Sequence, residues 1–217
     1  MEKFKSLKDH VYDYIAEQIL EGNLEPEQKI NENVICHELN ISRTPVREAL
    51  IQLASEGVLK NRARKGFVVR ALSPQEVVDL YGVIGVLDGY AARLAVNNLT
   101  EKDLANMSFY VESMDVAIKA GNYEMYHVQQ MAFHDVYTKE CGNSALIEEI
   151  GRLKSKLIKK KYADNGDGKT QEILYRTNEE HREILKLFQE KDGDRLFDYL
   201  LNVHWRQSYA EYDAKQR

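Results

Sequence analysis

The 217 residues carry a net charge of −5, 43% hydrophobic side chains and only three prolines, which excludes a disordered chain and favours two helical units. No apolar run approaches the roughly 20 residues that span a bilayer, and the N-terminus lacks the apolar core of a signal peptide, so a membrane protein is excluded and a cytoplasmic one is expected. The two cysteines, Cys36 and Cys141, have no C-x-x-C spacing and indicate neither a zinc knuckle nor a disulfide framework.

Three helices are predicted at the start of the chain, over residues 6–21, 31–39 and 42–57. Their apolar residues recur at the 3.6-residue spacing of helices that bury one face. Asn40 is expected to end the second helix in a left-handed conformation. Ser42 or Thr44 is expected to cap the third helix, where Pro45 in the first turn costs no hydrogen bond.

A hairpin is predicted directly after these helices. Two short β-prone runs, Val58–Lys60 and Phe67–Val69, flank a turn that contains Gly66. Residues 43–70 hold seven cations against two anions, a net charge of +5 inside an acidic chain. A helix N-terminus and a basic hairpin presented together suit a double helix better than a small substrate. The stretch therefore predicts a winged helix-turn-helix that binds DNA.

The rest of the chain is predicted to be helical throughout. Ser73-Pro74-Gln75-Glu76 is a capping box with proline at the first helical position. Helices are expected over residues 74–97, 101–120, 122–141, 144–162, 170–190 and 193–212. The fold class is thus mostly α, with a winged helix-turn-helix domain of three helices and a two-stranded wing over 1–71 and an all-helical bundle over 72–217.

A resemblance to a known family is carried by the run SRTPVREAL at Ser42–Leu50, with Leu53, Gly57 and Gly66 after it. This stretch resembles the DNA-binding domain of GntR-family bacterial transcription regulators. The helical remainder is similar to the FCD-type domain of their FadR subfamily. The resemblance implies a repressor, not an enzyme, that binds a double-stranded operator as a homodimer. It also implies a small-molecule effector, an organic acid, which binds the helical domain and alters operator affinity.

The family pattern assigns DNA contacts to the third helix and the wing. Arg43 and Arg47 are expected to reach base edges, because an arginine fork matches O6 and N7 of guanine. Thr44 and the helix N-terminus are expected to hold phosphate. Gly66 marks the wing tip, where a missing side chain lets the backbone approach the minor groove. Further phosphate contacts from the wing are expected from Arg62, Arg64 and Lys65.

Two features of this DNA-binding stretch have alternative interpretations. Asn33 stands in the second helix at a position where many relatives carry an arginine that contacts DNA. For Arg47, the alternative to a base contact is a surface ion pair with Glu48 or Glu56, a type of interaction that contributes little to stability.

A metal site is implied by three histidines on different predicted helices, His134, His181 and His204. They match three of the four positions at which FCD-type relatives often hold a divalent metal. Imidazole suits zinc or nickel, and three imidazoles leave coordination positions open for water or a carboxylate. Gln130 stands at the family's aspartate position, either as a weak ligand or as part of an effector pocket. The alternative is three partly buried side chains of a helical bundle.

The first helix of the FCD-like domain has Gly85 and Asp88 where relatives tend to carry an arginine and a glutamate. The usual arginine would help to hold an acidic effector. Two alternative functions follow from these replacements. One is a DNA-binding dimer with a degenerate pocket that binds no effector. The other is a tri-histidine metalloenzyme that activates water.

Overall fold

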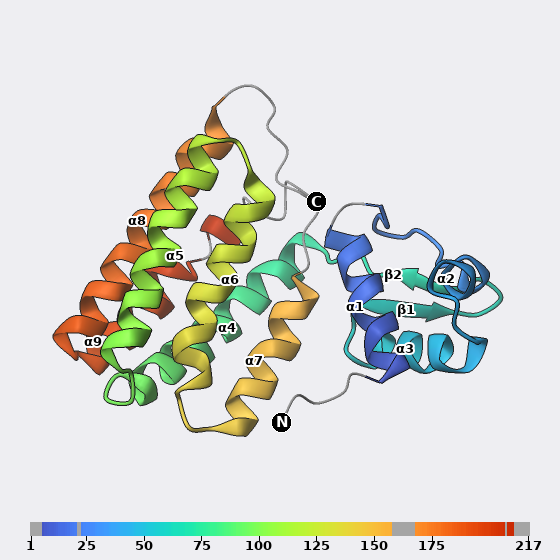
Figure 1. The fold of residues 1–217 in the computed structure, drawn as a ribbon, viewed down its shortest axis with the longest axis horizontal. Coiled ribbons are helices and arrows are strands. Elements are labelled where there is room, and N and C mark those ends of the chain that lie inside the picture. Colours follow the sequence, from blue (N-terminus) through green and yellow to red (C-terminus); the bar gives the residue numbers. More distant parts are fainter. Residues whose placement is uncertain (1–5, 21–22, 158–167, 207, 211–217) are drawn as a thin grey trace. The chain divides into compact units, whose positions relative to one another are not determined.

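The computed structural model describes residues 6–20, 23–157, 168–206 and 208–210 (Figure 1). The chain divides into two compact units, with the main break between Leu72 and Ser73. Among the helices of the described ranges, none is both long and apolar enough to cross a membrane.

The first unit contains three helices, α1 (Leu7–Leu20), α2 (Glu32–Leu39) and α3 (Arg43–Ser55). Asn31 caps α2 by accepting a hydrogen bond from a backbone N–H, and Asn40 ends it at φ +52°, as its sequence predicts. Ser42 rather than Thr44 is the N-cap residue of α3. The buried apolar faces of the three helices form one core, which includes Val11, Ile15, Ile35, Val46, Leu50 and Leu53.

The predicted wing is an antiparallel hairpin of β1 (Leu59–Arg62) and β2 (Gly66–Val69). Leu59 pairs with Val69 and Arg62 pairs with Gly66, so the turn between the strands is three residues long. Gly66 lies at the start of β2 with φ +79°, a conformation that costs glycine little because it has no Cβ. Leu59 and Phe67–Val69 are buried, so one side of the hairpin is anchored while its tip stays exposed.

The second unit is a helical bundle of α4 (Pro74–Ala95), α5 (Glu101–Lys119), α6 (Tyr123–Lys139), α7 (Ser144–Lys156) up to Leu153, α8 (Lys169–Glu190) and α9 (Gly193–Tyr199). Ser73 with Glu76 and Thr100 with Asp103 form capping boxes that begin α4 and α5. α5 packs on α6 and α8, while α4 packs on α6 and α9. The core between them holds large buried side chains, including Met107, Met114, Ile118, Phe133, Tyr137 and Phe188.

The end of the chain differs from the expected single helix over 193–212, which is wrong. α9 passes at Leu200 into a π-helical turn, η1 (Leu200–His204), and the helix ends at Trp205. The backbone N–H of Trp205 donates to the carbonyl of Leu200, five residues earlier, at 2.9 Å. A π turn holds an extra residue, so the side chains after it are rotated relative to an α-helix. The expected helix over 144–162 also ends early, at Lys156, and residues 158–167 lie outside the described ranges.

Candidate nucleic-acid interface and candidate metal centre

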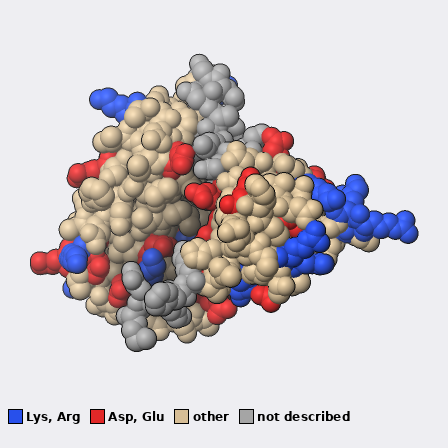
Figure 2. Space-filling view, turned by 45° about the vertical axis from the view of Figure 1, so that its right-hand side comes forward, with Lys and Arg blue, Asp and Glu red and all other residues tan. Residues whose placement is uncertain are grey.

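The predicted DNA contacts lie on the surface of the first unit, at the start of α3 and on the hairpin. Arg43, Thr44 and Arg47 are exposed on α3. Ser42 makes no side-chain hydrogen bond to the N–H groups of the first turn of α3. These groups point out of a helix N-terminus, which carries a partial positive charge and suits an anion such as phosphate. Figure 2 shows lysine and arginine side chains gathered at one end of this unit.

A groove separates the α2–α3 region from the wing. It is lined by Lys29, Ile30, Asn31, Glu32, Asn33, Arg43, Arg64, Lys65, Gly66 and Phe67. Four of these side chains are cationic and one is anionic, so the groove has a positive electrostatic potential. Arg62 also lies on the wing and forms an ion pair with Glu27. The structure therefore brings the start of α3 and the wing tip to the two sides of one basic groove.

The arginines of α3 have partners on α2. Arg43 donates to the side-chain oxygen of Asn33 at 2.7 Å, so Asn33 orients the Arg43 side chain. The Arg47 side chain lies 3.9 Å from Glu32 rather than against Glu48 or Glu56. Both arginines remain exposed, and an exposed ion pair of this length contributes at most about 1 kcal/mol. Such weak contacts leave both side chains able to change partner.

The three predicted histidines come together inside the second unit. His134 lies on α6, His181 on α8 and His204 on η1, and these residues are 2%, 0% and 5% exposed. Their ligand atoms all lie within 4.8 Å of one another. A tetrahedral zinc site with bonds of about 2.05 Å places its nitrogens about 3.3 Å apart, so small side-chain movements would complete such a site. Gln130 lies one turn before His134 and is partly exposed.

The carboxylate of Asp88 lies behind His134. It accepts hydrogen bonds from the Tyr137 hydroxyl at 2.7 Å and from the Trp205 indole at 2.9 Å, and it lies 3.2 Å from Nδ1 of His134. Asp88 is fully buried on α4. Burial, followed by the charge of Asp88, raises the pKa of Tyr137 well above its ordinary value, so this phenol keeps its proton.

This arrangement fixes the tautomer of His134. Tyr137 has one proton and donates it to Asp88, so its oxygen accepts from Nδ1 of His134 at 2.6 Å. Nδ1 of His134 therefore carries the ring proton of the neutral imidazole. Its Nε2 then has a lone pair, and this atom is 3.1 Å from Nε2 of His204.

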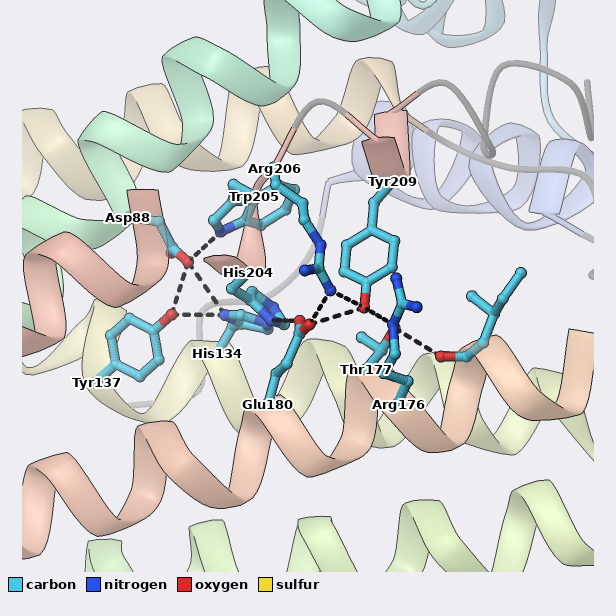
Figure 3. A network of polar contacts seen from close by, with 11 residues as sticks. Asp88, His134, Tyr137, Arg176, Thr177, Glu180, His204, Trp205, Arg206 and Tyr209 are labelled. Atoms are coloured by element: carbon cyan, nitrogen blue, oxygen red, sulfur yellow. Dashed lines mark hydrogen bonds and ion pairs between the residues drawn. The ribbon is translucent and has the colours of Figure 1, made fainter. Parts of the chain in front are cut away.

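Glu180 acts on His204 in the same way (Figure 3). Its carboxylate lies 3.2 Å from Nδ1 of His204 and accepts from Arg206 at 2.5 Å and from Tyr209 at 2.7 Å. A carboxylate only accepts, so Nδ1 of His204 is the donor and Nε2 again has a lone pair. If both rings are neutral, two lone pairs face each other at 3.1 Å, and a cation bound to both nitrogens would remove their repulsion. Outer carboxylates that hold histidine ligands in this tautomer are typical of metal sites.

Gly85 lies where α4 comes closest to Trp205. A Cβ at this position would lie 3.0 Å from Cβ of Trp205 and 3.5 Å from Cα of Leu201. Trp205 therefore packs closely over α4 at Gly85. The indole ring also lies near Tyr81, with a centroid distance of 5.1 Å.

Three further residues of the site were missed by sequence reasoning: Tyr137, Glu180 and Trp205. Glu180 directly precedes His181, and Trp205 directly follows His204. This adjacency is the only sequence signal that could have pointed to them. Tyr137 follows His134 by three residues and thus shares its helix face, which a search restricted to metal ligands does not consider.

Comparisons with known proteins agree with both units. Residues 7–69 match the family model described as "Bacterial regulatory proteins, gntR family", and residues 79–203 match the FCD domain. The chain is 27% identical over 176 residues to the Nta operon transcriptional regulator of Aminobacter aminovorans, covering 81% of this chain and 80% of that one. It is 27% identical over 195 residues to the gluconate operon transcriptional repressor of Bacillus licheniformis, covering 84% and 76%. The solved structure of E. coli McbR/YncC shares the fold, with a TM-score of 0.82 and 23% identity over 98% of this chain and all of that one.

Proposed function

We propose the following function from the premise that this chain belongs to the GntR family of bacterial regulatory proteins, carries an FCD domain and is a DNA-binding transcription regulator. It acts in the cytoplasm as a homodimeric repressor on a pseudo-palindromic, double-stranded operator. Relatives that are named as operon repressors, such as that of Bacillus licheniformis, support the sign of regulation. The two-fold symmetry of a dimer would be mirrored in the two half-sites of the operator.

In this proposal the operator is held by the basic groove. Arg43 and Arg47 read base edges in the major groove, and Thr44 with the first turn of α3 holds phosphate. The wing places Gly66 near the minor groove and adds phosphate contacts from Arg62, Arg64 and Lys65. Two observations support these DNA contacts. The arginine and lysine side chains are exposed, and a single groove lies between α3 and the wing.

We further propose that His134, His181 and His204 hold a divalent metal, with zinc or nickel as the best match to three imidazoles. The observation that carries this proposal is the 3.1 Å approach of two Nε2 atoms whose Nδ1 atoms both face carboxylates. A bound metal would supply open coordination positions for the carboxylate of an organic acid. The protein's own part is to hold three imidazoles close together and to exclude bulk water from them.

The effector proposal follows from this centre. A small organic acid would bind beside the three histidines, with Gln130 as a possible lining residue on α6. Trp205 fills the space at Gly85, so this chain cannot use an arginine from that position of α4. The effector would therefore be smaller, or less dependent on a salt bridge, than one held by such an arginine.

Two measurements test the proposed function. Tag-free protein would be analysed for bound metals by mass spectrometry, with His181→Ala as the matched variant. We expect about one zinc or nickel per chain in the wild type and a strong loss in the variant. Selection from random DNA should enrich an inverted repeat, and organic acids should weaken its binding only when metal is present. A metal-free wild type under metal excess would refute the centre, and enrichment of no repeat would refute operator recognition.

A further inference from the structure

One face of α4 leaves a row of apolar residues in contact with solvent. Val83, Val86 and Tyr90 are 50%, 45% and 37% exposed, and Gly82 lies beside them. Their spacing of three, four and seven residues places them on a single stripe of the helix. The other side of α4 is buried in the bundle through residues such as Ile84. The stripe is therefore a second apolar face that the fold of the second unit does not use.

Charged residues stand at the two ends of this stripe. Asp79 is exposed one turn before Gly82, and Arg93 is exposed one turn after Tyr90. Asp79 and Arg93 are each seven residues from Val86, and Gly82 and Tyr90 are each four residues from it. Val86 is thus the midpoint of this face. An acidic and a basic residue lie equally far from it in opposite directions, and so do a glycine and a tyrosine.

From this pattern we propose that α4 packs antiparallel against α4 of a second copy of this chain, with the two-fold axis at Val86. The inference rests on the homodimer of the proposed function and specifies its interface. In an antiparallel pair, residues equally far from the axis in opposite directions face each other. Asp79 then meets Arg93 of the partner subunit, and Gly82 meets Tyr90 of the partner subunit.

The charges fit this arrangement. Seven residues at 1.5 Å each place Asp79 and Arg93 about 10 Å from the axis along α4, where side chains of two crossing helices still reach each other. The Arg93 guanidinium lies over the Tyr90 ring, 5.3 Å from its centroid, and 3.5 Å from the exposed carboxylate of Asp194. Asp79 accepts a hydrogen bond from Gln75 at 2.8 Å. Both groups are held on the α4 face by contacts that remain compatible with an additional partner.

The shapes fit as well. A Cβ added at Gly82 would meet no atom within 4 Å, so the helix surface is shallow there and open to an incoming side chain. Tyr90 is the largest side chain of the stripe and lies at the symmetry-related position. The two-fold axis forms this contact twice, each time between Gly82 of one subunit and Tyr90 of the partner subunit. An isologous interface of this kind closes at two subunits and does not propagate into a filament.

Cysteine crosslinking at the axis tests this interface. Val86→Cys in a Cys36→Ser background places two thiols next to each other across the axis, within the Cα separation of about 7 Å that a disulfide allows. We expect most of the oxidised protein to migrate as a covalent dimer on a non-reducing gel. Val116→Cys on α5 is the matched control, because Val116 is 69% exposed but lies off the α4 stripe. A dimeric protein in which Val116→Cys crosslinks and Val86→Cys does not would overturn the proposal.

Charge exchange gives a second test that does not depend on thiol chemistry. In sedimentation equilibrium, Asp79→Arg should raise the dimer dissociation constant at least tenfold, with an unchanged circular dichroism spectrum. Adding Arg93→Asp should restore most of the dimer, because the ion pair is rebuilt in the opposite sense. A double variant as weak as the single one would overturn the pairing. A wild type that stays monomeric even on operator DNA would instead refute the homodimer itself, which separates the two failures.

Discussion

Asp88→Asn should weaken metal binding, although it preserves the size of the side chain. The asparagine can still accept from Tyr137 or Trp205 through its amide oxygen. It lacks the charge that keeps the His134 ring proton on Nδ1, so the proton can occupy Nε2 and block the ligand atom. Loss of an outer carboxylate typically costs about 10–100-fold in metal affinity, which is about 1.4–2.7 kcal/mol.

Thermal unfolding with and without metal measures this effect. At a metal concentration of 100 times the wild-type Kd, binding stabilises the wild type by about 2.7 kcal/mol. A Kd that is 10–100-fold weaker reduces this gain to about 1.4 or 0.4 kcal/mol. At roughly 2–4 °C per kcal/mol for a chain of this size, the metal-induced rise in Tm falls from about 5–11 °C to about 1–6 °C.

Asp135→Asn provides the matched control for this experiment. Asp135 follows His134 on α6 but forms an exposed ion pair with Lys139 at 2.8 Å. Its replacement removes the same charge one residue away from the ligand, and it should leave the metal-induced rise in Tm intact. The reasoning is refuted if Asp88→Asn retains the full rise, or if Asp135→Asn loses as much of it.

Four further predictions concern the DNA-binding surface and glycines of α4 and α7. Arg47→Ala should weaken operator binding by about 1–3 kcal/mol with little effect on random DNA, measured by filter binding, and equal losses on both would contradict base reading. Lys65→Ala should weaken binding to all sequences and reduce the slope of log affinity against log salt by about 0.9, whereas an unchanged slope would exclude a phosphate contact. Gly89→Ala should destabilise the fold by about 1–3 kcal/mol in urea unfolding, because its Cβ would lie 3.0 Å from the carbonyl oxygen of Phe197. Gly151→Ala, whose Cβ would meet nothing within 4 Å, should instead stabilise it by about 0.5–1 kcal/mol.

The parts of the structure that depend on local signals were predictable from the sequence. Asn40 ends α2 at a positive φ, and Ser73 with Glu76 begins α4 with a capping box. These signals act within a few residues, because a cap satisfies backbone groups of its own helix turn. The three histidines were also expected to meet, but this expectation came from the family resemblance and not from their spacing.

The surroundings of the histidines could not be predicted because they depend on contacts between distant segments. Trp205 reaches Asp88 across 117 positions of the sequence, and the π turn that precedes it has no local sequence signature. Gly85 was interpreted from the sequence as the loss of an arginine. In the fold it is the position where α4 leaves room for Trp205. The close packing of Trp205 on Gly85 joins segments that are 120 positions apart, so it is visible only in three dimensions.

Trp205 has a consequence for spectroscopy, because it is the only tryptophan of the chain. All of its indole fluorescence therefore originates from one ring, whose centroid is 6.0 Å from that of His134 and 5.8 Å from that of His204. A paramagnetic ion such as Co²⁺ or Ni²⁺ bound by these imidazoles would quench this emission at contact range, whereas Zn²⁺ would not. The native protein thus contains an intrinsic optical reporter for the proposed metal centre, and titrations require neither a label nor an added chromophore.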